Sequence, residues 1–256
     1  MTQKKIVIGN MKMNPVSVVE FERYLDMLGK EMKKNDFEKT ELVICPPEVY
    51  LTKLVDEKIS GVKSGVQDIF WEHQGAFTGE VSAAMVKSLG AGFCIVGHSE
   101  RRKYFGENGE IISLKLKAIL KSGLTAVLCI GESMEERKRE QTSGVIKKQL
   151  KEAFDGIAPG RLEHIVVAYE PIWAVGTDKL PTSDEILEVK IIIKKSLAEM
   201  YPAKSIEKVR LLYGGSVKSN LVEQTCLDPA MDGVLVGRES LMPYEIVKIA
   251  KIIDGN

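Results

Sequence analysis

Short apolar runs alternate with longer amphipathic stretches eight times along the chain, and this alternation restricts the fold more than any other feature. Within each run the apolar residues are nearly continuous, as is typical of parallel strands covered on both faces. The pattern therefore predicts an α/β protein with a parallel sheet. The expected strands are KIVIGN (5–10), ELVIC (41–45), SGVQDI (64–69), FCIVG (93–97), TAVLCIG (125–131), HIVVAYE (164–170), VRLLYGG (209–215) and GVLVG (233–237).

Helical patterns separate these runs. Apolar residues recur at intervals of three and four in 18–32, and similar patterns cover 110–123, 182–200 and 244–253. Thr182 and Glu185 form a capping-box pattern at the start of the third of these segments. Eight strand–helix alternations in residues 1–256 predict one (β/α)8 TIM barrel in a single domain. An open doubly wound sheet is the alternative, but no glycine-rich dinucleotide fingerprint follows the first run.

Composition narrows the possible partners. Lys plus Arg and Asp plus Glu number 36 each, so no net charge attracts nucleic acid or an acidic membrane surface. No apolar run approaches the ~18 residues of a membrane span, and the N-terminus lacks the apolar segment of a signal peptide. The four cysteines are scattered without a CxxC pair. We therefore expect a cytoplasmic protein that acts on small molecules and binds neither nucleic acid nor membrane.

Polar residues at the ends of the expected strands are the candidates for function, because barrels of this kind place the active site there. Asn10 and Lys12 end the first strand, His98 follows the fourth, and Glu170 ends the sixth. Glycine-rich turns follow strands seven and eight, where the backbone can approach a phosphate closely. A carboxylate base, an imidazole and a fixed cation at one mouth suit proton transfer next to a carbonyl.

Metal-assisted and Schiff-base chemistries suit these residues less well. Metal-assisted enolisation needs several carboxylates or imidazoles at neighbouring strand ends, and the sequence lacks them, so we expect no metal. A Schiff-base aldolase needs a buried lysine, and Lys12 is the only candidate. Each residue alone is consistent with a strand cap or a solvated end, and their convergence on one mouth favours function. His73 and His164 are expected to be structural.

Several segments resemble the signature segments of the triosephosphate isomerase family, in that family's order and across nearly the whole chain. The most specific are VGHSERR (96–102) and AYEPIWAVGT (168–177). The resemblance implies a glycolytic and gluconeogenic isomerase that interconverts dihydroxyacetone phosphate and glyceraldehyde 3-phosphate without a cofactor. The other matching segments are NMKMN (10–14), GAFTGE (75–80), LCIGE (128–132), YGGSV (213–217) and GVLVG (233–237).

The resemblance also implies a role for each matching residue. Glu170 is implied to be the base, His98 the electrophile and Lys12 the electrostatic anchor. Asn10 is implied to position Lys12 and the substrate. The remaining implied roles are Ser99 and Glu100 as partners of the catalytic residues, and Gly176, Ser216, Gly237 and Arg238 as the phosphate site.

Residues 171–177 are implied to form a lid, which excludes water from a reactive intermediate. Pro171 and Trp173 lie in its leading hinge and Thr177 near its other end, and Tyr213 to Ser216 are implied to latch it when closed. The loop 74–80 is implied to dock into a partner subunit, where Thr78 supports the other active site. The expected assembly is therefore a homodimer.

Three positions depart from the family pattern. Arg238 and Asp178 stand where the family usually has glycine, and Asp68 stands where it usually has asparagine. Arg238 either points out of the site or places a cation beside the phosphate, and Asp178 predicts altered kinetics of lid opening. Arg238 and segment 179–183 also resemble a branch of the family that isomerises tetrulose phosphates such as L-erythrulose 1-phosphate. That substrate class is one alternative, and a phosphosugar-binding barrel without catalysis is another.

Overall fold

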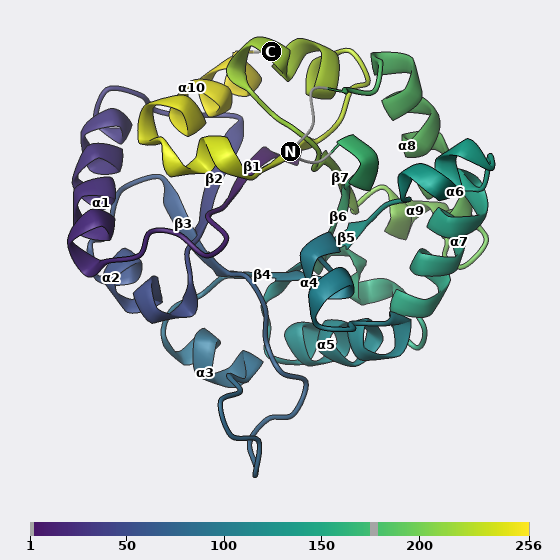
Figure 1. Ribbon diagram of the computed structural model, residues 1–256, viewed down its shortest axis with the longest axis horizontal. Helices are drawn as coiled ribbons and strands as arrows, with labels where there is room; N and C mark the ends of the chain where they lie inside the picture. The colour runs from purple at the N-terminus through teal and green to yellow at the C-terminus, as the bar shows by residue number, and fades with distance from the viewer. Residues whose placement is uncertain (1–2, 175–178, 256) are drawn as a thin grey trace.

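The chain folds into a closed barrel of eight parallel strands. Figure 1 looks into the barrel, which a ring of helices surrounds. The computed structural model describes residues 3–174 and 179–255. Neighbouring strands in the sequence pair with one another, and β1 also pairs with β8, which closes the barrel. The strands are β1 (Lys5–Asn10), β2 (Thr40–Cys45), β3 (Val62–Val66), β4 (Phe93–Val96), β5 (Thr125–Ile130), β6 (Ile165–Tyr169), β7 (Arg210–Tyr213) and β8 (Gly233–Val236).

Helices surround the barrel and cover its outer face (Figure 1). The α-helices are α1 (Val18–Met32), α2 (Leu51–Asp56), α3 (Ala83–Ser88), α4 (Ser99–Tyr104), α5 (Gly109–Lys121), α6 (Met134–Lys138), α7 (Thr142–Ala153), α8 (Ser183–Ala198), α9 (Ala203–Ile206) and α10 (Pro243–Asp254). Short 3-10 or π turns are η1 (Glu48–Tyr50), η2 (Pro159–His164), η3 (Ile172–Ala174), η4 (Ser219–Leu221), η5 (Glu223–Leu227) and η6 (Arg238–Leu241).

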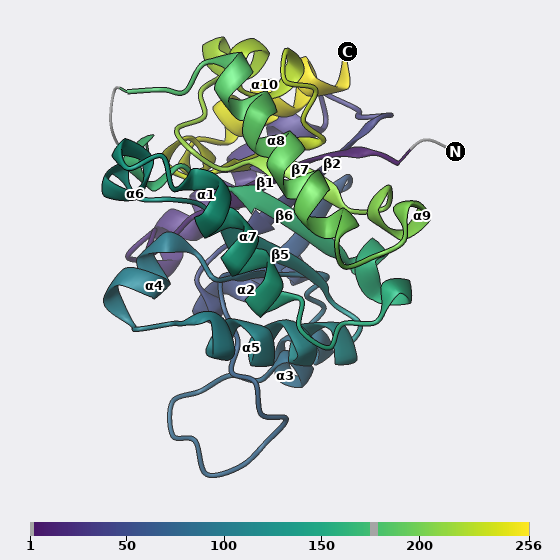
Figure 2. The ribbon, with the colours of Figure 1, turned by 90° about the vertical axis from the view of Figure 1, so that its right-hand side faces the viewer.

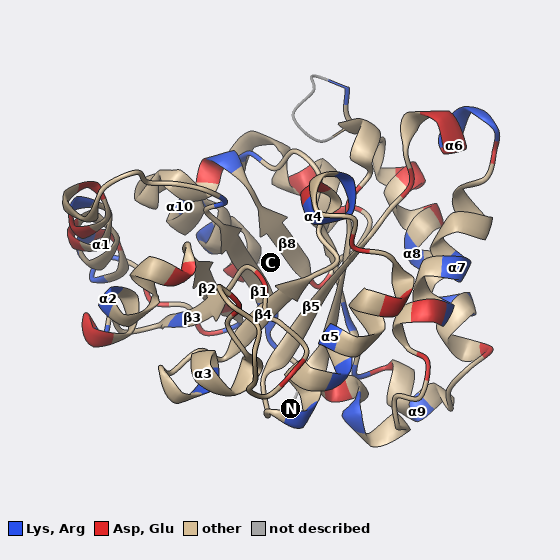
Figure 3. Ribbon diagram, turned by 60° about the horizontal axis from the view of Figure 1, so that its bottom comes forward, with Lys and Arg blue, Asp and Glu red and all other residues tan. Residues whose placement is uncertain are grey.

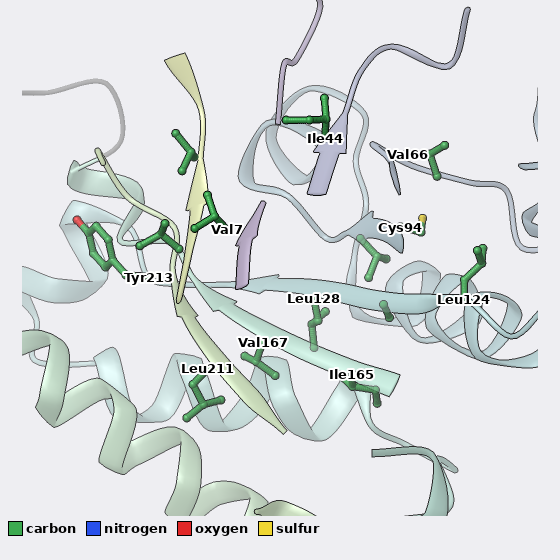
Figure 4. Packing of buried hydrophobic residues seen from close by; sticks show 14 of the residues in the cluster. Val7, Ile44, Val66, Cys94, Leu124, Leu128, Ile165, Val167, Leu211 and Tyr213 are labelled. Atoms are coloured by element: carbon green, nitrogen blue, oxygen red, sulfur yellow. The ribbon is translucent and has the colours of Figure 1, made fainter. Parts of the chain in front are cut away.

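Every strand except β3 contributes to two separate apolar cores, because successive side chains point to opposite faces of the sheet. Ile6 and Ile8 of β1 belong to the cluster that fills the barrel. Val7 between them belongs to the larger cluster that joins the barrel to the helices. Figure 4 shows part of this outer cluster, including Val7, Leu128 and Val167. Burial on both faces is the physical reason for the continuous apolar runs in the sequence.

The predicted (β/α)8 barrel in a single domain is confirmed, and most predicted elements fall within two residues of the observed ones. The capping box between Thr182 and Glu185 starts α8. The strand predicted at 64–69 is wrong at its carboxyl end, because β3 covers Val62–Val66 and the chain leaves the sheet at Gln67. The Gln67 side chain donates there to the backbone oxygens of Lys12 and Cys45, in place of a further strand pairing.

Charged residues of both signs are interspersed along the helices and loops, as Figure 3 shows, in keeping with the zero net charge. Within the described part of the chain, no helix is both long enough and apolar enough to cross a bilayer.

Closure of the barrel depends on a glycine at the β1–β8 seam. Gly233 pairs with Ile6 and has a φ of +147°, and an added Cβ would lie 1.8 Å from the Ile6 carbonyl oxygen. A backbone atom cannot move aside as a flexible side chain can. We therefore expect Gly233→Ala to lower the free energy of unfolding by about 3 kcal/mol or more, measured by urea denaturation.

Gly144→Ala is the matched control. Gly144 lies in α7, and nothing lies within 4 Å of an added Cβ there. Alanine is more favourable than glycine within a helix, so the free energy of unfolding of this variant should rise by ~0.5–1 kcal/mol. A Gly233→Ala protein as stable as the wild type would contradict the strained seam.

Candidate active site

Glu170 and His98 meet at the carboxyl end of the barrel. Glu170 directly follows β6, and its backbone N–H donates to the Ile130 carbonyl at 2.7 Å, which extends the β5–β6 ladder by one residue. His98 follows β4 and caps the N-terminus of α4. Its Nε2 lies 3.2 Å from Glu170 Oε1, and both side chains are buried. The sheet thus brings together a carboxylate and an imidazole that lie 72 positions apart in the sequence.

The hydrogen bonds of His98 indicate the form of its ring. Its Nδ1 accepts a hydrogen bond of 3.2 Å from the Glu100 backbone N–H. A nitrogen that accepts carries no proton, so the ring is neutral and its proton sits on Nε2, facing Glu170.

Lys12 is held by its backbone. Its φ of +52° lies in the left-handed region, which a lysine rarely adopts. Its N–H donates to Asn10 Oδ1 at 3.0 Å, and Gln67 Nε2 donates to its carbonyl at 2.8 Å. The ammonium pairs with Glu100 Oε1 at 2.6 Å, and both side chains are partly exposed. Such a pair contributes little to stability, so an anionic substrate can compete with Glu100 for the cation.

A cavity of about 410 Å³ opens over these residues. An added Cβ on Gly214 would lie 2.9 Å from Glu170 Cγ, so the turn after β7 packs directly against the carboxylate. The turn after β8 lies on the other side, with Gly237 close to the Lys12 stem. Predicted site residues that line the cavity are Asn10, Lys12, His98, Glu170, Ser216, Gly237 and Arg238.

Ser216 and Tyr213 differ in their bonding. The Ser216 hydroxyl donates to the Ala174 carbonyl at 2.9 Å. The Tyr213 hydroxyl is buried and finds no hydrogen-bond partner within the described residues. Burial raises the pKa of this phenol well above its usual range. Among the described residues, Ser216 thus contacts the start of the predicted lid and Tyr213 does not, and the latch stays a prediction.

Pro171 and Trp173 begin the predicted lid in a short turn, in which the Ala174 N–H donates to the Pro171 carbonyl at 2.8 Å. The Trp173 indole donates to Glu132 Oε1 at 2.8 Å. Glu132 is fully buried and also accepts from the Tyr169 hydroxyl at 3.1 Å. No role was assigned to Glu132 from the sequence, although it follows its strand by two residues, as Lys12 does.

The remaining predicted residues lie away from the cavity or outside the described residues. Ser99 approaches Glu170 Oε2 through its backbone N–H at 3.2 Å. Thr78 is exposed in the loop that projects from the barrel in Figure 2. His73 lies in the same loop, and His164 lies at the opposite end of β6. Gly176 and Thr177, together with Asp178, lie outside the described residues.

Asp68 belongs to a buried cluster of four charges behind the site. Its carboxylate lies 2.8 Å from Arg101 Nη2 and 2.6 Å from Lys115 Nζ, and both cations also contact Glu107. Because Arg101 lies in α4, the cluster ties the helix that carries His98 to the end of β3. Among the described residues, no group of three or more His, Cys, Asp or Glu gathers as a metal site.

Comparisons with known proteins agree with one another. The family model described as Triosephosphate isomerase matches residues 5–253. The Triosephosphate isomerase of Alkaliphilus oremlandii is 40% identical over 96% of this chain and 98% of its own length. That of Lactobacillus delbrueckii subsp. bulgaricus is 41% identical over 99% of this chain and all of its own. The crystal structure of triosephosphate isomerase from Bartonella henselae has a TM-score of 0.85 and 31% identity, and covers 97% of this chain and 98% of its own.

The buried cluster predicts a pH dependence of stability. Burial raises the pKa of Asp68 to about 6, although Lys115 opposes the effect. Between pH 4 and 6, Asp68 therefore keeps its proton in the folded protein but loses it in the unfolded chain. Because of this difference, the contribution of Asp68 to the free energy of unfolding falls as the pH rises. The free energy of unfolding of Asp68→Asn minus that of the wild type should therefore rise by up to about 3 kcal/mol from pH 4 to pH 7, because asparagine does not titrate. Denaturant titration at both pH values measures this difference.

Asp26→Asn is the control, since Asp26 is exposed on α1 and pairs only with Lys30 among the described residues. We expect its effect to stay within about 0.5 kcal/mol at both pH values. A constant difference between Asp68→Asn and the wild type from pH 4 to 7 would refute the proton held by Asp68.

Proposed function

The chain belongs to the triosephosphate isomerase family, and we propose that it interconverts dihydroxyacetone phosphate and glyceraldehyde 3-phosphate with Glu170, His98 and Lys12 as its reacting groups. It is an aldose–ketose isomerase by family, and its substrate class is sugar phosphates. The observation that carries the assignment of residues is the 3.2 Å approach of His98 Nε2 to Glu170 Oε1 inside the cavity lined by Lys12. The predicted cytoplasmic location stays a prediction.

The geometry supports a proton shuttle through an enediolate. Glu170 removes a proton from the carbon next to the substrate carbonyl and returns it to the neighbouring carbon. The neutral His98 ring donates from Nε2 to the oxygens of these two carbons as their bonding changes. The Lys12 ammonium stabilises the negative charge that develops on them. No electrons leave the substrate, so the reaction balances without a cofactor.

The phosphate is proposed to bind the turns after β7 and β8, through Ser216, Gly237 and Arg238. Arg238 lines the cavity, and no ion pair engages it within the described part of the chain. Its cation is therefore available to an anionic group. Gly176 and Thr177 of the predicted lid are proposed to complete this site from above. Nothing in the comparisons favours the tetrulose phosphate alternative or a non-catalytic barrel.

We further propose a homodimer formed through loop 74–80, with Thr78 reaching the partner's site. The loop projects from the barrel in Figure 2, and every residue from 74 to 80 is exposed. Phe77 packs on Phe70 with ring centroids 4.6 Å apart and remains 44% exposed. Met13 and Val16, which follow β1, are almost fully exposed. Burying these apolar side chains against a second copy would stabilise the dimer.

Glu170→Asp tests the base. The shorter side chain withdraws the carboxylate by about one carbon–carbon bond, and a displacement of that size costs about 100-fold or more in kcat. The affinity for inorganic phosphate should change by less than about twofold, because the phosphate turns are untouched. Steady-state kinetics with glyceraldehyde 3-phosphate and competition by inorganic phosphate measure the two effects.

Glu163→Asp makes the same change at the other end of β6, where Glu163 is exposed and pairs with Lys208. This control should keep the wild-type kcat and KM. If Glu170→Asp turns over as fast as the wild type, Glu170 is not the base.

Phe77→Glu tests the dimer, since a charge on the docking loop opposes burial. We expect the dimer to weaken about 30-fold or more, as for a central interface residue, measured by sedimentation equilibrium. Ile191→Glu on α8 is the control, because Ile191 has the same exposed fraction of 44% and lies on the barrel's outer helices. A wild-type protein that stays monomeric would refute the proposed assembly directly.

A further inference from the structure

Arg137 lies at the centre of a group of contacts to which the proposed mechanism gives no role. It belongs to α6, the short helix after β5, and 27% of its side chain is exposed. Its guanidinium touches Trp173, Glu132 and Glu185, which come from three different parts of the chain. These contacts lie on the two sides of residues 175–178, so Arg137 joins the chain that enters this segment to the chain that leaves it.

On the entering side, the guanidinium stacks over the Trp173 ring, with Cζ 4.2 Å from the ring centroid. Its Nη1 lies 3.6 Å from Glu132 Oε1, the same oxygen that accepts the Trp173 indole N–H. Glu132 is fully buried, and a buried carboxylate needs a nearby positive charge. Arg137 supplies that charge and also fixes the plane of the Trp173 ring.

On the leaving side, Arg137 Nη2 forms a close ion pair with Glu185 Oε1. The other oxygen of Glu185 accepts the Thr182 N–H at 2.7 Å, and the Glu185 N–H donates to the Thr182 hydroxyl at 3.2 Å. These bonds are the capping box that begins α8. Arg137 is thus connected to the first turn of α8 through a single carboxylate.

Both sides lead back to the cavity. Ala174 follows Trp173, and its carbonyl accepts the Ser216 hydroxyl at 2.9 Å. Leu180 precedes Thr182 by two residues and lines the cavity together with Ser216. One guanidinium therefore sets the spacing between two pieces of chain that border the proposed phosphate site.

The contacts contribute too little individually for stability to be their main role. A partly exposed cation–π contact contributes about 0.5–1 kcal/mol, and a partly exposed ion pair about 0–1 kcal/mol. A planar guanidinium, however, orients three groups at once in a way that a lysine ammonium cannot. The arrangement is therefore better suited to holding geometry than to holding the fold together.

We propose that Arg137 is a positioning residue for phosphate binding, which holds Trp173 and the start of α8 at the spacing that the bound phosphate needs. The inference rests on the proposed function, since it concerns the same cavity. Without Arg137 the two pieces of chain are ordered only when the phosphate binds. The free-energy cost of that ordering then weakens substrate and phosphate binding, and it leaves the rate of the proton transfer itself nearly unchanged.

The test is Arg137→Ala, compared with Arg139→Ala, which removes an exposed arginine just after the same helix. We expect the KM for glyceraldehyde 3-phosphate to rise about 5- to 10-fold while kcat changes less than about twofold. The dissociation constant of inorganic phosphate should rise by a similar factor, followed by Trp173 fluorescence in a Trp71→Phe background. Arg139→Ala should leave all three values unchanged.

Glu185→Gln breaks only the link to α8, because glutamine preserves a capping box. It should raise KM and the phosphate dissociation constant about 3-fold, and its combination with Arg137→Ala should be no worse than Arg137→Ala alone. Unchanged phosphate binding in a folded Arg137→Ala protein overturns the proposal, whatever its melting temperature. Should Arg137→Ala not fold, unchanged binding in Glu185→Gln overturns it. A wild type that binds phosphate but does not isomerise refutes the proposed function alone.

Discussion

Closure of the sheet through the β1–β8 pairing is the constraint on which the site depends. Parallel strands in a closed barrel all end at the same rim, so residues that follow β1, β4 and β6 meet although they lie far apart in the sequence. Lys12, His98 and Glu170 reach one cavity for this reason. An open sheet with the same strands would spread these three residues along an edge.

Backbone hydrogen bonds then fix each proposed reacting group more tightly than side-chain packing alone. Glu170 is the last residue of a β-ladder, His98 is locked by a backbone N–H to its Nδ1, and Lys12 is held in a left-handed conformation by Asn10 and Gln67. Preorganised groups of this kind need no rearrangement as charge develops in the transition state. Glu100 balances the Lys12 charge through a partly exposed pair, which a substrate anion can displace.

The sequence was sufficient for the barrel and for the meeting of Lys12, His98 and Glu170 at one cavity, because both follow from periodicity and from position after a strand. It misplaced the end of β3, where Gln67 bonds to the carbonyls of Lys12, just after β1, and of Cys45 in β2. It also assigned no role to Glu132 or Arg137. Glu132 and Arg137 contact each other, but their other partners come from distant parts of the chain. No local sequence pattern encodes such contacts.

The two halves of the cavity differ in what holds them. The half that carries Glu170 is built from strand ends and backbone bonds, which cannot be exchanged without unravelling the barrel. The half proposed to face the phosphate is held by single side-chain contacts, from Ser216 to Ala174 and from Trp173 to Glu132. Each such bond contributes about 1 kcal/mol net, so a bound anion can compensate for losing one or two of them. In the proposed mechanism, rigidity is therefore concentrated where protons move, and exchangeable contacts lie where substrate must enter and leave.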